Sequence, residues 1–188
     1  VFQVGANAGD NITVGALTNS TAKGLADVSY AFSQAASDVN ATAVSTLTAI
    51  TEPTTLSISI TGGSNVTLGE IKAASSGEER MGQIVEAINR KSADTGVTAF
   101  LSKNDSGTYK IDLMSSKLDS AGDATVVTTV GFTLATTGLV GAALASNINA
   151  TNTTTDALGI DTLTVDTQRN AWVALKKIDA AIDQVNSA

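Results

Sequence analysis

The side chains that could carry chemistry in this sequence are mainly carboxylates, and three of them stand in turn-like segments. Asp105, Asp119 and Asp123 offer the hard oxygen ligands that calcium prefers. Their surroundings lack the alternating spacing of oxygen ligands that defines a calcium loop. Solvated turn carboxylates are therefore the preferred interpretation, and no metal site is assigned.

Two other groups of residues invite a functional interpretation. Glu78 and Glu79 stand beside Arg80, where their charge favours the start of a helix through the macrodipole and does not indicate an acid–base pair. Trp172 is of the type that stacks on carbohydrate, but it lies beside an apolar helical stripe. Packing at a domain junction is therefore the favoured role for this indole.

The composition removes most catalytic chemistry. The 188 residues contain no histidine and no cysteine. Catalytic triads, thiolate nucleophiles, zinc sites and haem sites of the usual kinds are therefore excluded. An enzyme that uses carboxylates alone is kept as a minor alternative, and no catalytic residue, metal ligand or cofactor is assigned.

The charge balance restricts the partners. There are 11 basic and 18 acidic residues, giving a net charge of −7. Basic residues are scattered except at Arg90-Lys91 and Lys176-Lys177, so no footprint for a phosphate backbone is present. The most apolar stretch, residues 133–148, is interrupted by glycines and polar residues and is shorter than the ~20 residues that a bilayer requires. Neither nucleic acid nor a membrane is expected as a partner.

The clearest local structure spans residues 55–114 and begins with a hairpin. Leu56, Ile58 and Ile60 alternate with polar residues, which predicts a half-buried strand. Gly62-Gly63 supplies a turn, and residues 65–68 form the returning strand.

A helix and a second hairpin complete this segment. Ser76 and Glu79 have the spacing of a capping box, in which the hydroxyl and the carboxylate bind orphan amides. The apolar positions that follow at helical spacing are Met81, Ile84, Val85 and Ile88. Residues 94–96 end the helix, and residues 97–102 are predicted as a strand. Residues 104–107 form a turn. The strand that follows has Tyr109, Ile111 and Leu113 on one face. The segment is predicted as a β-β-α-β-β unit.

The flanking segments give weaker patterns. Leu25, Val28, Phe32 and Ala35 suggest a short helix, and residues 42–51 favour extended structure up to a break at Pro53. The other flank is predicted as a strand at 125–134, a short helix at 140–148 and a polar linker at 147–155.

A heptad seam marks the C-terminal segment. Its apolar positions, spaced by four, three, four and three, are Ala171, Leu175, Ile178, Ile182 and Val185. Thr167 or Asp166 can cap the helix over residues 168–186. A helix of about five turns is marginal in isolation, so it should pack against partner helices. Burial of the stripe on its own domain is an equally open alternative.

The two ends and the centre together resemble bacterial flagellin. FQVGANAGD at residues 2–10, followed by ITV at 12–14, is similar to the segment that leaves the inner rod for the variable outer part. Ile160-Asp161, Thr167-Gln168 and ALKKIDAAIDQVNS at 174–187 look like the re-entry into the rod. The β-β-α-β-β unit resembles a motif of flagellin and hook-associated outer domains.

The resemblance implies an α+β, β-rich fold with a C-terminal heptad helix from the inner rod. Residues 1–17 and 156–188 would be the edges of the inner rod (D1) domain, and residues 18–155 an outer, D2-type domain. The implied function is that of an extracellular structural subunit of the flagellar filament, supporting motility and exposed as an antigen. Its partners would be other flagellin subunits, with antibodies or host surfaces as further candidates. Without the remaining terminal helices, the chain would be a monomer unable to polymerise.

Two further possibilities follow from the surface. Outer domains of this family often carry O-linked sugars, and the candidate acceptors, if exposed in loops, are Thr136, Thr137, Thr153, Thr154 and Thr155. The alternative function is a cell-surface flagellin homologue or adhesin module that binds polysaccharide or host ligand. Such sites usually need exposed aromatics or a basic cluster, and only 4% of the residues are aromatic.

Overall fold

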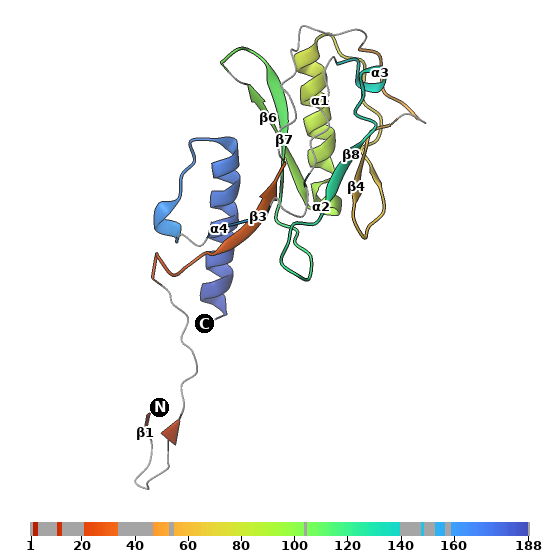
Figure 1. Cartoon of the computed structure of the whole chain (residues 1–188). Coiled ribbons are helices and arrows are strands. Elements are labelled where there is room, and N and C mark those ends of the chain that lie inside the picture. Colours follow the sequence, from red (N-terminus) through yellow and green to blue (C-terminus); the bar gives the residue numbers. More distant parts are fainter. Residues whose placement is uncertain are drawn as a thin grey trace. The chain divides into compact units, whose positions relative to one another are not determined.

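The computed structural model has mixed α+β architecture with antiparallel sheets and a C-terminal helix, as predicted (Figure 1). It describes residues 2–3, 11–12, 21–33, 47–52, 55–103, 105–139, 148, 153–156 and 159–187. The chain divides into two compact units. We call residues 29–155 the large unit, and residues 1–28 together with 156–188 the terminal unit.

The first predicted hairpin is confirmed in the large unit. Strand β4 (Ser57–Ile60) pairs antiparallel with β5 (Val66–Thr67), and Gly62 in the intervening turn has a φ of +79°. Leu56, Ile58 and Ile60 are buried, because the period of two places them on one face. A positive φ is strained for residues with a side chain, so glycine suits this turn.

Helix α1 (Gly77–Arg90) begins at the predicted cap. The N–H of Glu79 donates to the Ser76 hydroxyl at 3.2 Å, which satisfies one of the orphan amides of the first turn. The Glu79 carboxylate accepts from the N–H of Ser75 at 2.7 Å, one residue before the amide expected for a capping box. The helix ends at Arg90, and a further short helix, α2 (Ser92–Thr95), leads to Gly96 at a φ of +71°.

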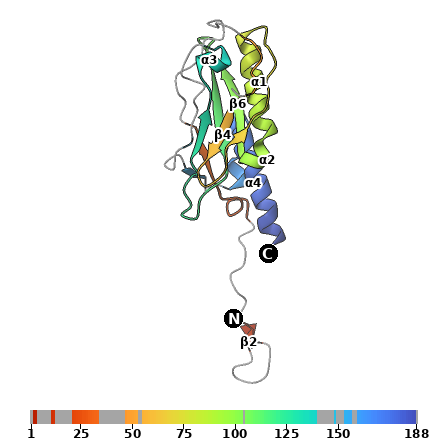
Figure 2. The same cartoon turned by 90° about the vertical axis from the view of Figure 1, so that its right-hand side faces the viewer.

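The second hairpin consists of β6 (Val97–Lys103) and β7 (Tyr109–Ser115), paired over their full lengths. Tyr109, Ile111 and Leu113 are buried on one face, as predicted. Met114 on the opposite face is also buried, so β7 is covered on both sides. In Figure 2, α1 runs alongside the strands of this unit.

The two hairpins belong to different sheets. The four-stranded sheet has the order β6-β7-β3-β9, with β3 (Val28–Phe32) and β9 (Thr153–Asp156) drawn from the flanks. The three-stranded sheet has the order β5-β4-β8, with β8 at Val127–Val130. Both sheets and α1 share one core, whose members include Leu56, Ile58, Met81, Ile84, Ile88, Ala99, Ile111, Leu113 and Val127.

Two predictions for the flanks are wrong. Residues 28–32 form a strand and not a helix, because Val28, Tyr30 and Phe32 favour extended backbone and β7 offers a partner. Residues 153–155 form part of β9 and not a linker, since a run of β-branched threonines suits the edge of a sheet. The strand expected over 125–134 is confirmed at Val127–Val130.

Other parts of the flanks fall partly or wholly outside the described residues. Ala35, Pro53 and most of the helix predicted at 140–148 lie outside them. Ile148 is described, buried, and bridged to Val127. A short helix, α3 (Leu134–Thr137), follows β8 and was not expected.

The terminal unit is built around helix α4 (Gln168–Asn186), which has the predicted bounds and the predicted cap at Thr167. Its other elements are the paired strands β1 (Phe2–Gln3) and β2 (Asn11–Ile12) and the 3-10 helix η3 (Ile160–Thr162). Its buried apolar cluster contains Leu25, Ala26 and Ala181, with Ile160 packed against them. This cluster is small, and polar contacts and close backbone packing supplement it.

Candidate functional site

The carboxylates considered as metal ligands are exposed, and Asp119 and Asp123 share one turn. Asp119 accepts the N–H groups of Ala121 and Asp123 at 2.8 and 3.1 Å, which makes it part of a tight turn. Asp105 and Asp123 are exposed. Within the described residues, no cluster of three or more acidic side chains is arranged to hold a metal ion. The turn interpretation therefore accounts for the carboxylates as the structure places them.

The acidic pair at the start of α1 makes structural contacts. Glu78 accepts a hydrogen bond from the Tyr109 hydroxyl, and the amide of Ser75 lowers the pKa of Glu79 by binding its ionised form. Arg80 is fully buried and donates to the carbonyl of Thr48, and its burial lowers the pKa of the guanidinium. Neither carboxylate is arranged as an acid–base pair, and the burial of Arg80 was not anticipated from the sequence.

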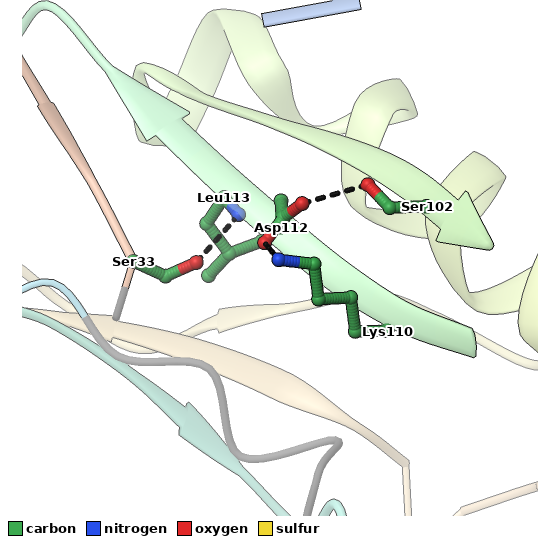
Figure 3. Close-up of polar contacts among 5 residues, drawn as sticks. All are labelled: Ser33, Ser102, Lys110, Asp112 and Leu113. Atoms are coloured by element: carbon green, nitrogen blue, oxygen red, sulfur yellow. Dashed lines mark hydrogen bonds and ion pairs between the residues drawn. The ribbon is translucent and has the colours of Figure 1, made fainter. Parts of the chain in front are cut away.

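A second polar cluster, also not anticipated, connects three strands of the large unit (Figure 3). The Ser102 hydroxyl of β6 donates to Asp112 of β7 at 2.7 Å, and Lys110 Nζ lies 3.4 Å from the other carboxylate oxygen. On the other side of β7, the Ser33 N–H donates to the carbonyl of Leu113 at 2.9 Å. The Leu113 N–H in turn donates to the Ser33 hydroxyl at 2.8 Å. These contacts join strands and do not assemble a nucleophile with a base.

The predicted heptad seam is the main exposed apolar feature of α4. The exposed fractions are 63% for Leu175, 43% for Ile178, 54% for Ile182 and 51% for Val185. Ala171, at the start of the stripe, is half-buried. We call these five residues the α4 seam. The alternative in which the stripe is buried on its own domain does not describe this structure.

A different face of α4 packs within the terminal unit. Its buried residues are Val173, Ala174, Lys177 and Ala181. The Lys177 ammonium, 2% exposed at its side chain, forms an ion pair of 2.8 Å with Asp156. Gln184 accepts from the N–H of Ala26 at 3.2 Å and donates to the carbonyl of Gly24 at 3.3 Å. The helix is therefore held by Val173, by small residues and by polar contacts, and the aliphatic side chains of the α4 seam stay exposed.

Trp172 lies next to the seam and is half-buried. The Lys176 ammonium stands 5.7 Å from the centroid of its ring, a distance at which a cation–π interaction forms. One face of the indole therefore has a partner within α4. This arrangement agrees with a packing role for Trp172, which stays a prediction.

The candidate acceptors of O-linked sugars are only partly accessible. Thr137 is buried in α3, donates to the carbonyl of Thr133 at 2.8 Å, and accepts from the N–H of Leu139. The expected exposed loop is therefore absent at Thr137. Thr136, Thr153 and Thr154 are half-buried and Thr155 is exposed, and glycosylation at these four positions stays a prediction.

The described residues contain no helix long and apolar enough to cross a bilayer. The described residues form a packed α+β unit and a C-terminal helix with an exposed apolar stripe. Comparison with known proteins adds what the central segment resembles. Residues 55–117 match the family model described as the flagellin hook IN motif, which coincides with β4, β5, α1, α2, β6 and β7. This segment is therefore similar to the flagellin hook IN motif, and the match supports a structural component of the bacterial flagellum.

Solved structures to which the chain is similar include three of flagellar cap proteins. The D2-D3 domains of FliD from Escherichia coli are 19% identical, with 77% of this chain and 72% of that chain covered and a TM-score of 0.35. The D1-D2-D3 domains of the same protein are 17% identical, with 86% and 54% covered and a TM-score of 0.35. FliD (HAP2) from Pseudomonas aeruginosa PAO1 is 21% identical, with 79% and 72% covered and a TM-score of 0.31. No curated protein matches the chain.

Proposed function

We propose that this chain is part of a subunit of the bacterial flagellar filament. In this proposal residues 29–155 are the surface-exposed outer domain, available to antibodies, and α4 belongs to the inner rod that holds subunits together. The flagellin hook IN motif at residues 55–117 supports a flagellar role. The exposure of the α4 seam is the observation that carries the more specific assignment to a polymer.

The energetics of the seam favour a covering helix. Leu175, Ile178 and Ile182 are each at least 43% exposed, and burial of a large aliphatic side chain contributes about 1.5–3 kcal/mol relative to full exposure. Apolar residues at spacings of four and three present a continuous edge into which side chains of another helix pack. A contact of this kind, repeated between subunits by a rotation that does not close, generates a filament.

Electron microscopy in the bacterium that encodes the chain tests this proposal. The gene would carry either Leu175→Ser with Ile182→Ser, or Val165→Ser as the matched control. Val165 is 74% exposed but lies before α4, outside the seam. We expect gold-labelled antibodies against the chain to decorate wild-type filaments along their length. The seam variant should build at least tenfold fewer filaments, whereas the control should build them normally.

The thermal unfolding of the purified chain separates assembly from folding. Because the seam is exposed, the double seam variant should melt within a few degrees of the wild type. Normal filaments from the seam variant would overturn the role of the seam. Label confined to the filament end, to the hook or to the cell wall would overturn the assignment to the filament itself.

A further inference from the structure

Strand β6 is the terminal strand of the four-stranded sheet, so among the described residues one of its edges has no neighbouring strand. Such an edge presents N–H and C=O groups that can pair with a strand of another molecule. Its sequence from Val97 to Ser102 is β-prone and carries no charge, which are features of segments that self-associate through strand pairing.

The register shows which groups face the open edge. Ala99 lies opposite Leu113 of β7. The N–H and the C=O of Leu113 are both bound by Ser33, on the side of β7 away from β6. Ala99 and Leu113 are therefore a non-hydrogen-bonded pair, and the N–H and C=O of Ala99 point away from β7.

Both of these Ala99 groups are bound by one side chain of α1. The N–H of Ala99 donates to Asn89 Oδ1 at 2.7 Å, and Asn89 Nδ2 donates to the carbonyl of Ala99 at 3.0 Å. A carboxamide offers the same acceptor and donor as a peptide group. Asn89 thus makes the two hydrogen bonds that a residue on an adjacent antiparallel strand would make.

Two other residues of β6 also make this edge less available for strand pairing. The N–H of Val97, which faces the same side as that of Ala99, donates to the Thr95 hydroxyl at 3.2 Å. At the other end, Lys103 is exposed and its ammonium stands 4.9 Å from the Tyr109 ring centroid. A lysine on an edge strand disfavours pairing with another chain because its charge would be brought against that chain.

We propose that Asn89 closes the outer edge of β6 by substituting for a neighbouring strand, and that it thereby prevents antiparallel pairing of β6 with β6 of a second copy. Ala99 is 1% exposed, so loss of the Asn89 side chain leaves two buried polar groups without their partners. That loss favours opening of the end of α1, and pairing with another strand then satisfies both groups. The inference is independent of the proposed function.

Three variants of the 188-residue chain test the proposal. Asn89→Ala removes both hydrogen bonds. Asn89→Asp keeps an acceptor for the Ala99 N–H and places a charge at the edge, which disfavours strand pairing. Gln83→Ala is the matched control, because Gln83 is the other amide side chain of α1 and binds the carbonyl of Ala73 at 3.5 Å, away from β6.

Hydrogen exchange and sedimentation are the two measurements. We expect Asn89→Ala to accelerate exchange of the Ala99 amide at least tenfold in dilute solution, with a smaller change at Phe100, whose N–H faces β7. Its sedimentation mass should rise with concentration from 18.9 kDa toward twice that value, whereas Asn89→Asp and Gln83→Ala stay monomeric.

Other outcomes would overturn the closure of the edge. A monomeric Asn89→Ala variant at all concentrations would show that Asn89 only anchors α1. Equal self-association of the Ala and Asp variants would show general destabilisation, and so would equal acceleration of exchange at Ala99 and Phe100.

Discussion

Helices α1 and α4 have the same kind of sequence and opposite surroundings. Each has apolar residues at spacings of three and four, and each begins at a hydroxyl cap, Ser76 or Thr167. Ile84 of α1 is completely buried, whereas Ile178 of α4 is 43% exposed. A helical pattern therefore defines an apolar face without showing what covers it.

The difference arises from what each unit offers its helix. In the large unit, two sheets present apolar side chains that pack with α1 into one core. In the terminal unit, the buried apolar cluster contains only Leu25, Ala26 and Ala181 among the described residues. The buried face of α4 consists of Val173, two alanines and Lys177, and the four large aliphatic residues of the α4 seam stay exposed.

The largest expected effect comes from truncating matched isoleucines on the two helices. Ile84→Ala should lower the free energy of unfolding by about 2–5 kcal/mol, because it removes buried atoms and leaves a cavity. Ile178→Ala should cost much less, about 1 kcal/mol at most, since 43% of Ile178 is already exposed and no closed cavity is left. Urea unfolding followed by circular dichroism measures both variants. Equal losses would contradict the contrast and would indicate that the seam is covered in solution.

An intermediate effect is expected from glycines with different surroundings. A Cβ added at Gly159 would lie 2.0 Å from the carbonyl oxygen of Ala22, whereas one added at Gly82 of α1 has open space around it. Gly159→Ala should therefore destabilise the terminal unit by about 1–3 kcal/mol, as overpacking does. Gly82→Ala should stabilise α1 by about 0.5–1 kcal/mol through helix propensity.

The single tryptophan makes the glycine comparison measurable. Trp172 lies on α4, so its fluorescence reports on the terminal unit during urea unfolding. Gly159→Ala should move the fluorescence midpoint to lower urea, and Gly82→Ala should leave it in place. An unchanged midpoint in the Gly159 variant would mean that the segment around Ala22 adapts without loss.

The smallest expected effect concerns pH at the two helix starts. The pKa of Glu79 is lowered from its ordinary value of 4.5 chiefly by the Ser75 amide, and that of Asp166 from 3.8 chiefly by the Asn170 side chain. The stabilisation from a lowered carboxyl pKa is present above the unfolded value and is lost as the pH falls through the folded value. Acid should therefore weaken both helix starts.

Melting temperatures measured between about pH 6 and pH 3 check this effect. Glu79→Gln and Asp166→Asn each remove one titrating carboxylate. On acidification, the melting temperature of each variant should therefore fall less than that of the wild type. A variant that follows the wild-type curve throughout would show that its carboxylate does not contribute to the pH dependence.

The elements that sequence analysis predicted correctly are those with strong local signals. The bounds of α4 and the cap of α1 follow from periodicity and from hydroxyl residues placed before an apolar run. The strands of both central hairpins follow from alternation and from turn residues. The helix predicted around residues 25–35 was wrong because the apolar spacings at residues 28–32 fit a helix as well as a strand. Pairing with β7 decided for the strand.

The sequence predicted the candidate functional residues only in part. The positions of the α4 seam came from the sequence, whereas its exposure came from the structure. The buried Arg80, Lys177 and Asp112 were missed, because a charged residue in an amphipathic pattern is ordinarily assigned to the solvated face. The pairing of Asn89 with Ala99 was missed as well, since it depends on how α1 crosses the edge of β6.

Local sequence signals were enough to predict α1, α4 and the strands of the two central hairpins, because helix caps, turns and periodicity act over a few residues. The composition alone excludes histidine and cysteine chemistry. The tertiary structure decided which strands share a sheet, which face of each helix is covered and where buried charges find partners. These outcomes depend on contacts between residues far apart in the chain. For α1 those contacts complete a core, whereas for α4 they leave the apolar seam exposed.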